Sequence, residues 1–177
     1  MHAGPEVGSR LRRLRVERAL SLSELARRAG IGKGTLSELE RGLRNPTIDT
    51  LYALCEPLGA PITALVGDTS GTVVDDPAGG RAIQLDVRQG ADGTVVEVFR
   101  LEFPAGAGHD SPRHGDDVRE DLVVTAGRLA VGPVGAAVEL GTGEHHAWTS
   151  DAPHVYRAVD GPAEAIVIIR TPPARAS

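Results

Sequence analysis

The chain has 177 residues, of which 41% are hydrophobic and 3% aromatic, and this length accommodates two small domains. Residues 1–67 hold ten basic against seven acidic residues, whereas residues 68–177 hold nine against seventeen. We therefore expect the first part to bind nucleic acid and the second part not to. The single cysteine, Cys55, excludes an internal disulfide, and no apolar run resembles a signal peptide or is long enough to span a bilayer. These features predict a cytoplasmic protein that makes no membrane contact.

The first predicted helix precedes Ser21 and carries an apolar stripe between Val7 and Leu14, surrounded by arginines. A second helix is expected to begin at Ser21, because its hydroxyl stands three residues before Glu24 in the pattern of a capping box. Gly30 suits the left-handed position that ends such a helix, since it has no Cβ atom to clash there. The sequence therefore predicts two short helical segments in the first 30 residues.

A third helix is expected to start near Gly32, with Leu36 and Leu39 on its inner face. Two short helices joined by about three turn residues that include a glycine are typical of a helix-turn-helix motif, which places its second helix in the DNA major groove. An ordinary helical hairpin within a larger core is the alternative. Thr47 is a good N-cap for a fourth helix, and residues 62–66 suit a short fifth one.

Residues 6–67 closely resemble the DNA-binding domain of XRE-type (lambda-repressor-like) transcriptional regulators, and the run from Leu25 to Pro46 carries the resemblance. This resemblance implies a five-helix bundle that binds double-stranded operator DNA as a homodimer. It also implies an ion pair between Arg15 and Glu40 that ties the first helix to the third. Seven residues occupy positions that meet DNA in this family: Gly32, Lys33, Gly34, Thr35, Ser37, Glu38 and Arg44.

Residues 68–80 are rich in Gly, Asp, Ser, Thr and Pro and are predicted to link the first domain to a second one over residues 81–177. Apolar and polar residues alternate in the runs 83–88 and 94–103, as they do in half-buried strands. Further strand candidates follow at short spacing, at 122–125, 128–131, 137–140, 146–149, 155–158 and 165–170. This pattern favours an all-β sandwich or barrel, so the whole chain is expected to be a multi-domain α and β protein.

Five residues of the second part resemble the two motifs of the cupin jelly-roll barrel. His114, Glu120 and Gly127 match the first motif, Asp116 stands where that motif has a second histidine, and His154 matches the second motif. His114, Asp116 and Glu120 share even parity, so a strand would point all three to one side. With His154 they are candidate ligands of a divalent metal, which could be Fe, Mn, Ni or Zn.

Because Asp116 departs from the cupin motif, two alternatives to a metal site stay open. One is a metal-free pocket for a small organic effector, and the other is a barrel with a purely structural role. The pocket is expected to be lined by His114, Glu120, Trp148, His154 and Tyr156.

A helix-turn-helix head followed by a cupin is the domain order of a large class of bacterial regulators. The resemblance implies a sequence-specific DNA-binding regulator, not an enzyme, whose cupin domain senses a small-molecule effector and contributes dimer contacts. The competing hypothesis is a metal-dependent cupin enzyme with such a head, either a mononuclear-iron epoxidase or a dioxygenase-like protein. The epoxidase has a histidine four residues before its carboxylate, where this chain has Asp116.

Overall fold

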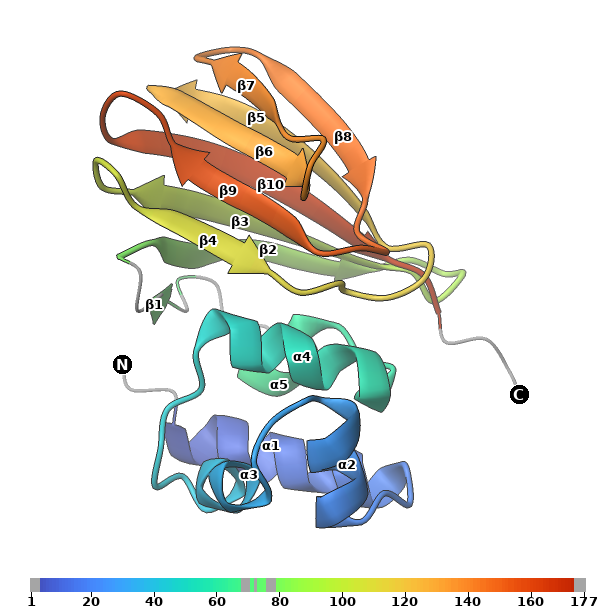
Figure 1. Cartoon of the computed structure of the whole chain (residues 1–177). Coiled ribbons are helices and arrows are strands. Elements are labelled where there is room, and N and C mark those ends of the chain that lie inside the picture. The colour runs from blue at the N-terminus through green and yellow to red at the C-terminus, as the bar shows by residue number, and fades with distance from the viewer. Residues whose placement is uncertain (1–3, 68–70, 72, 76–78, 174–177) are drawn as a thin grey trace.

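Helices precede strands along the chain, as the sequence predicts (Figure 1). The computed structural model describes residues 4–67, 71, 73–75 and 79–173. The helices are α1 (Gly4–Glu17), α2 (Leu22–Arg28), α3 (Lys33–Glu40), α4 (Ile48–Leu58) and α5 (Ile62–Val66). The strands are β1 (Val73–Asp75), β2 (Arg81–Gln89), β3 (Val95–Phe103), β4 (Gly108–Ser111), β5 (Arg119–Ala126), β6 (Arg128–Pro133), β7 (Val138–Gly141), β8 (His145–Thr149), β9 (His154–Ala158) and β10 (Ala163–Thr171).

Local signals at the ends of α2 act largely as predicted. The Ser21 hydroxyl accepts a hydrogen bond from the Glu24 backbone N–H at 3.1 Å, and Gly30 adopts the left-handed conformation with φ of 65°. The Glu24 carboxylate was expected to return to the Ser21 backbone. It accepts hydrogen bonds from Arg27 and Arg28 instead, because these side chains follow it at helical spacing.

A leucine core holds the helices together. Each fully buried leucine stabilises the fold by about 1.5–3 kcal/mol, so the predicted apolar stripes account for the packing of the helix-turn-helix. Residues of this core include Leu11, Leu25, Leu36, Leu39, Leu51, Leu54, Leu58 and Leu65.

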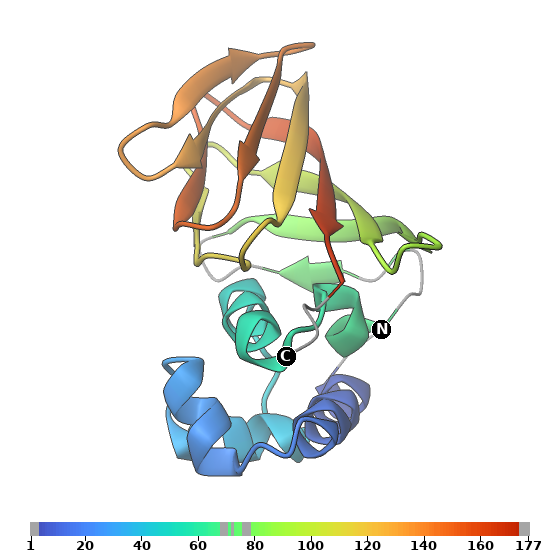
Figure 2. The ribbon, with the colours of Figure 1, turned by 90° about the vertical axis from the view of Figure 1, so that its right-hand side faces the viewer.

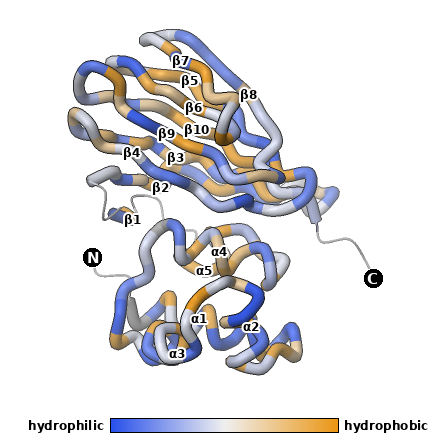
Figure 3. The backbone as a smooth tube through the Cα atoms, in the orientation of Figure 1, coloured by the Kyte–Doolittle hydropathy of each residue, from blue (hydrophilic) through white to orange (hydrophobic). Residues whose placement is uncertain are grey.

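The strands form two antiparallel sheets, in agreement with the predicted all-β sandwich or barrel. One sheet has the order β1-β2-β3-β10-β5-β8 and the other the order β4-β9-β6-β7. Figure 3 shows hydrophobic stretches along strands of both sheets, and their inward side chains include Phe99, Leu122, Leu129 and Ile169. Buried polar side chains interrupt this interior, and these form the site described below.

Two strands were missed by the sequence analysis. β1 lies within the segment predicted as a linker, where Val73 pairs with Ile83 of β2. β4 pairs with β9, and its buried residues are His109 and Ser111, so no apolar alternation marks it as a strand. The division of the chain into domains at residues 68–80 stays a prediction.

Helices α4 and α5 lie between the other helices and the β sheets (Figures 1 and 2). At this junction the buried Glu97 carboxylate of β3 accepts a hydrogen bond from the Thr63 backbone N–H of α5 at 2.8 Å. Glu56 of α4 pairs with Arg113 at 3.2 Å. Within the described residues, no helix has both the length and the apolar character needed to span a bilayer.

Candidate DNA-binding surface and buried carboxylate site

Helix α3 presents a polar face to solvent on the side of the helical region away from the β sheets (Figure 1). Lys33, Gly34 and Glu38 are exposed on this face, whereas Leu36 and Leu39 on the opposite face are buried. The apolar residues therefore fix α3 in the bundle and leave its polar residues accessible to a partner.

Packing within the chain gives no reason for a glycine at position 34. A Cβ atom there would have no atom within 4 Å, although glycine in a helix costs about 1 kcal/mol relative to alanine. At Gly8, by contrast, a Cβ atom would lie 2.3 Å from the Leu39 carbonyl oxygen, so the close approach of α1 to α3 requires glycine. Gly34 therefore suits a position at which another molecule approaches the backbone.

The other residues predicted to meet DNA lie on or directly beside α3. Gly32 is its N-cap, and the side chains of Thr35 and Ser37 are half-buried along its edges. Arg44, in the loop after α3, has its Nη1 atom 3.9 Å from Glu38 Oε2. All seven residues thus lie on or directly beside α3, and their contact with DNA stays a prediction.

The ion pair implied between α1 and α3 is present. Arg15 Nε donates to Glu40 Oε1 at 2.6 Å, and Arg15 Nη2 donates to Glu40 Oε2 at 2.9 Å. The third arm of the guanidinium, Nη1, donates to the Leu20 carbonyl oxygen at 2.9 Å. This forked geometry fixes the orientation of α3 relative to α1.

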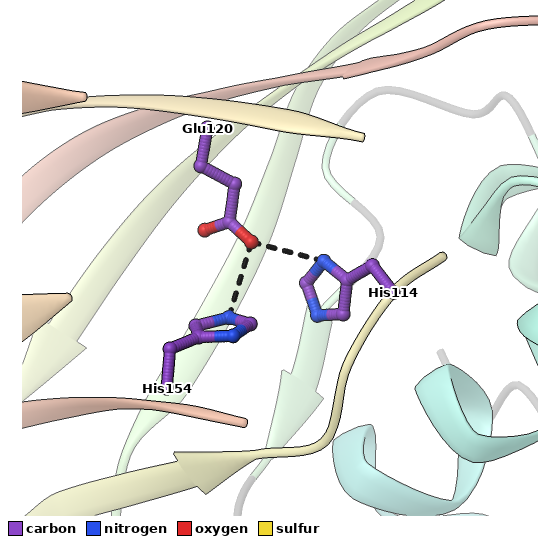
Figure 4. A group of neighbouring side chains, drawn as sticks. All are labelled: His114, Glu120 and His154. Carbon is purple, nitrogen blue, oxygen red and sulfur yellow. Dashed lines mark ion pairs between the residues drawn. The ribbon is translucent and has the colours of Figure 1, made fainter. Parts of the chain in front are cut away.

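A second cluster lies inside the β region, where three distant segments bring His114, Glu120 and His154 together (Figure 4). Glu120 comes from β5, His154 from the start of β9, and His114 from the turn before β5. Glu120 Oε1 lies 2.9 Å from His114 Nδ1 and 3.1 Å from His154 Nε2. We call these three residues the Glu120 site, and all three are buried.

Further polar groups orient the side chains of the Glu120 site. Ser150 Oγ donates to Glu120 Oε1 at 2.6 Å, and the Tyr156 hydroxyl donates to Glu120 Oε2. Ser111 Oγ lies 2.9 Å from His114 Nε2. His154 Nδ1 is 3.1 Å from the Ala152 carbonyl oxygen, an arrangement that directs the other ring nitrogen of His154 toward Glu120.

Burial and charge act against each other in the Glu120 site. Burial alone would raise the pKa of Glu120, but the facing rings of His114 and His154 hold it well below its ordinary value. Burial lowers the pKa of His114 and outweighs the attraction of Glu120. For His154, burial also lowers the pKa, but the adjacent Glu120 carboxylate prevails and raises it. These shifts favour an ionised Glu120 and favour protonation of His154 over protonation of His114.

Comparisons with known proteins identify the family of the helical region. The helix-turn-helix family HTH_3 matches residues 11–65. An HTH-type transcriptional regulator of Sinorhizobium fredii, y4dJ, is 47% identical over 66 residues, which are 37% of this chain and 86% of that protein. The chain belongs to the XRE-type helix-turn-helix family of transcriptional regulators.

The likeness to XRE-type regulators extends beyond the helical region. The HTH-type transcriptional regulator SutR of Escherichia coli is 29% identical over 149 residues, covering 83% of this chain and 84% of that protein. The crystal structure of an HTH_3 family transcriptional regulator from Vibrio cholerae superposes with a TM-score of 0.83 and 28% identity. That comparison covers 96% of this chain and 97% of the other, so the two proteins share the complete arrangement of helices and sheets.

Asp116, predicted as a metal ligand of this XRE-type regulator, does not join the Glu120 site. Its side chain is 82% exposed and accepts a hydrogen bond from Arg113 at 2.7 Å. The parity argument fails because residues 114–118 precede β5 and form a turn, with φ of 140° at Gly115 and 63° at Asp117. Only residues on a continuous strand alternate strictly in direction.

The predicted pocket residues Trp148 and Tyr156 do lie beside the Glu120 site. Their rings are 5.8 Å and 5.6 Å from the ring of His154, respectively, and both are buried. A third aromatic residue was missed, because Tyr52 belongs to α4 of the DNA-binding region. Its ring stacks on His114 with centroids 3.7 Å apart and planes inclined by 12°.

The donor set of the Glu120 site fits a divalent metal. Two histidines and one carboxylate place one ligand atom each within 4.8 Å of one another. Within the described part of the chain, His114 Nδ1 and His154 Nε2 make no hydrogen bond, although both are buried and face Glu120 Oε1. His154 holds its other nitrogen against a backbone carbonyl, as metal-binding histidines commonly do.

Proposed function

We propose that this XRE-type regulator binds operator DNA through α3 and senses a small effector, with or without a divalent metal, at the Glu120 site. The observation that carries the proposal is the buried group of potential ligand atoms on His114, Glu120 and His154. The same chain keeps an exposed polar face on α3. A buried cluster whose inward nitrogens lack a hydrogen-bond donor or acceptor among the described residues is better explained by a bound ligand than by packing alone.

For DNA binding, Lys33 would donate to the acceptors of guanine, and Glu38 would accept from a cytosine amine. Gly32 and Thr35 stand at the start of α3, where backbone and hydroxyl donors suit phosphate contacts. Two copies would bind half-sites about 34 Å apart, one turn of the double helix. The β sheets would supply contacts between the two copies.

For sensing, a bound cation would be held by His114, Glu120 and His154 and would supply a Lewis-acid centre to an effector bearing oxygen or nitrogen. Tyr156 and Ser150 hold the carboxylate in place by donating to its two oxygens. Burial and the charge of Glu120 raise the pKa of Tyr156 well above its ordinary value, so its hydroxyl stays a donor. These residues orient the ligand atoms before any effector arrives.

The proposal is tested by selecting duplexes from a random DNA library with the full chain and measuring its metal content after purification without a tag. We expect a palindromic consensus and near one equivalent of metal, or of a co-purifying organic ligand, that changes the affinity for the selected duplex. No enrichment of any sequence would contradict DNA recognition by α3. An empty β domain, with no metal or small molecule altering DNA affinity, would contradict sensing.

A second candidate function, metal-dependent catalysis, is favoured by the donor set alone, which non-haem Fe(II) oxygenases share. The two candidates differ in what metal loading does to DNA binding. A sensor must bind its effector with different affinity in DNA-competent and incompetent states. Iron loading that leaves affinity for the selected duplex unchanged would favour the enzyme.

A further inference from the structure

Helix α4 is shared between the DNA-binding region and the Glu120 site. Leu51, Leu54 and Leu58 on one face of α4 are buried in the helical core. Tyr52 on another face is only 8% exposed and stacks on His114 of the Glu120 site. Figure 4 shows helical ribbon on the His114 side of this site. One helix thus joins the packing of both regions.

Tyr52 is flanked on α4 by two further contacts to the same β segment. Asp49 Oδ1 lies 3.4 Å from His109 Nε2 of β4, and Glu56 pairs with Arg113. Asp49, Tyr52 and Glu56 follow one another at spacings of three and four residues, so they lie on one face of the helix. We call these three residues the α4 contact face.

The segment that contacts the α4 contact face, residues 109–114, is itself connected to the Glu120 site. The ring of His109 stacks on Tyr156 with centroids 5.9 Å apart, and the Tyr156 hydroxyl donates to Glu120. His114, whose ring stacks on Tyr52, faces Glu120 directly. A change in the orientation of His114 therefore alters its contact with Tyr52 or moves α4.

Helix α4 is also the element that follows α3 in the chain. The loop between them contains Arg44, which pairs with Glu38 of α3, and Leu43 donates its backbone N–H to the Glu38 carbonyl oxygen at 3.0 Å. Thr47 ends this loop and caps α4 by accepting from the Thr50 N–H. A movement of α4 would therefore shift the loop beside the candidate DNA contacts.

We propose that Tyr52 is a wall of the Glu120 site supplied by the DNA-binding region, and that it couples occupancy of this site to the position of α4. The inference rests on the proposed function, because it assumes that the Glu120 site takes a ligand. It assigns to Tyr52 a role beyond packing, since a ligand at His114 must either accept the tyrosine ring as a neighbour or displace it.

The test uses the full chain, Zn²⁺ as the probe and the selected duplex. We expect saturating Zn²⁺ to change the duplex affinity of the wild-type chain about fivefold or more, a typical size for coupling between two sites. Tyr52→Leu should reduce this change to less than about twofold while Zn²⁺ and the duplex each still bind. Tyr52→Phe, which keeps the ring, and Glu56→Gln, which alters the same helix face, should retain most of the change.

A Tyr52→Leu chain that binds Zn²⁺ and keeps the full change in duplex affinity would overturn the inference. Hydrogen exchange of the α4 amides separates this failure from a failure of the proposed function. In the metal-free chain, His114→Ala alone should speed the exchange of the α4 amides. Added to Tyr52→Leu, it should change the exchange rates little, because the stack between Tyr52 and His114 is already lost. If Zn²⁺ does not bind but this exchange pattern is observed, metal binding at the Glu120 site is contradicted, whereas the contact of Tyr52 with this site is supported. If His114→Ala leaves the exchange rates of the α4 amides unchanged, the proposed role of Tyr52 is contradicted, whether or not Zn²⁺ binds.

Discussion

The α3 surface and the Glu120 site place their polar residues in opposite environments. On α3, Lys33 and Glu38 are exposed over a layer of buried leucines. In the Glu120 site, the polar residues themselves occupy the interior and face one another at 2.6–3.1 Å. Stability and recognition are therefore carried by different residues on α3, whereas in the β region the same residues must serve both. Substitutions in the two regions should differ accordingly.

The largest effect on folding is expected for Glu120→Ala. Removing this carboxylate breaks its pairing with His154 and takes the acceptor away from the Ser150 and Tyr156 hydroxyls, and breaking a buried pair in this way costs about 3–5 kcal/mol. Urea unfolding of the metal-free chain measures the loss. Tyr156→Phe serves as the control, because it removes one donor and keeps the charges, with an expected loss of about 1 kcal/mol. A loss below 1 kcal/mol for Glu120→Ala would contradict the structural importance of the site.

Glu97 should make the stability of the junction depend on pH. Burial raises its pKa from 4.5 to about 7, against the opposing hydrogen bond from Thr63, while Tyr52 and Cys55 of α4 also lie near its charge. The folded chain therefore holds this proton more tightly than the unfolded chain, and stability falls as pH rises from about 4.5 to 7. A shift of this size corresponds to about 3 kcal/mol.

The measurement for Glu97 is the free energy of unfolding across this pH range for the wild-type chain and for Glu97→Gln. The variant keeps an oxygen that can accept from Thr63 but no longer titrates, so it should be the more stable chain at pH 8. Parallel pH profiles of the two chains would show that Glu97 does not titrate in this range.

A smaller effect is expected for Glu40→Ala in the helical region. Arg15 would lose a forked ion pair that is mostly shielded from water, and because both side chains retain some exposure we expect a loss of about 2 kcal/mol. Glu38→Ala, on the exposed face of the same helix, should stay within about 0.5 kcal/mol of wild type. Equal thermal melts for Glu40→Ala and wild type would contradict a stabilising role of the pair.

The same contrast explains how much the sequence could predict. The helix-turn-helix follows from local signals, such as the Ser21 cap and the leucine spacing, and these are visible in a short window of residues. The Glu120 site depends on which strands become neighbours, so His154 and Glu120 could be named by resemblance, but Asp116 was misplaced by a turn. Strand β4 was invisible because its buried residues are polar.

Tyr52 illustrates a limit of a different kind. Its spacing from Leu51 and Leu54 predicts a place on α4, and nothing local indicates that its ring reaches a histidine 62 positions later. The one available signal is the rarity of aromatic residues, since the chain has two tyrosines, and the other lies at the same site. A contact of this kind between the helical region and the β sheets can be identified only from the tertiary structure.

Lys33→Ala should give the smallest change in stability and a clear change in recognition. The side chain is exposed at the start of α3, so the free energy of unfolding should stay within about 0.5 kcal/mol of wild type. Specific affinity for the selected duplex should fall by about 1–3 kcal/mol, because a base contact is lost, and preference should relax at one base pair of each half-site. Arg44→Ala, at a predicted phosphate contact, should instead weaken binding to all sequences similarly and lower the salt dependence. If both variants lose affinity without any change in base preference, Lys33 contacts the backbone and sequence recognition lies with other residues of α3.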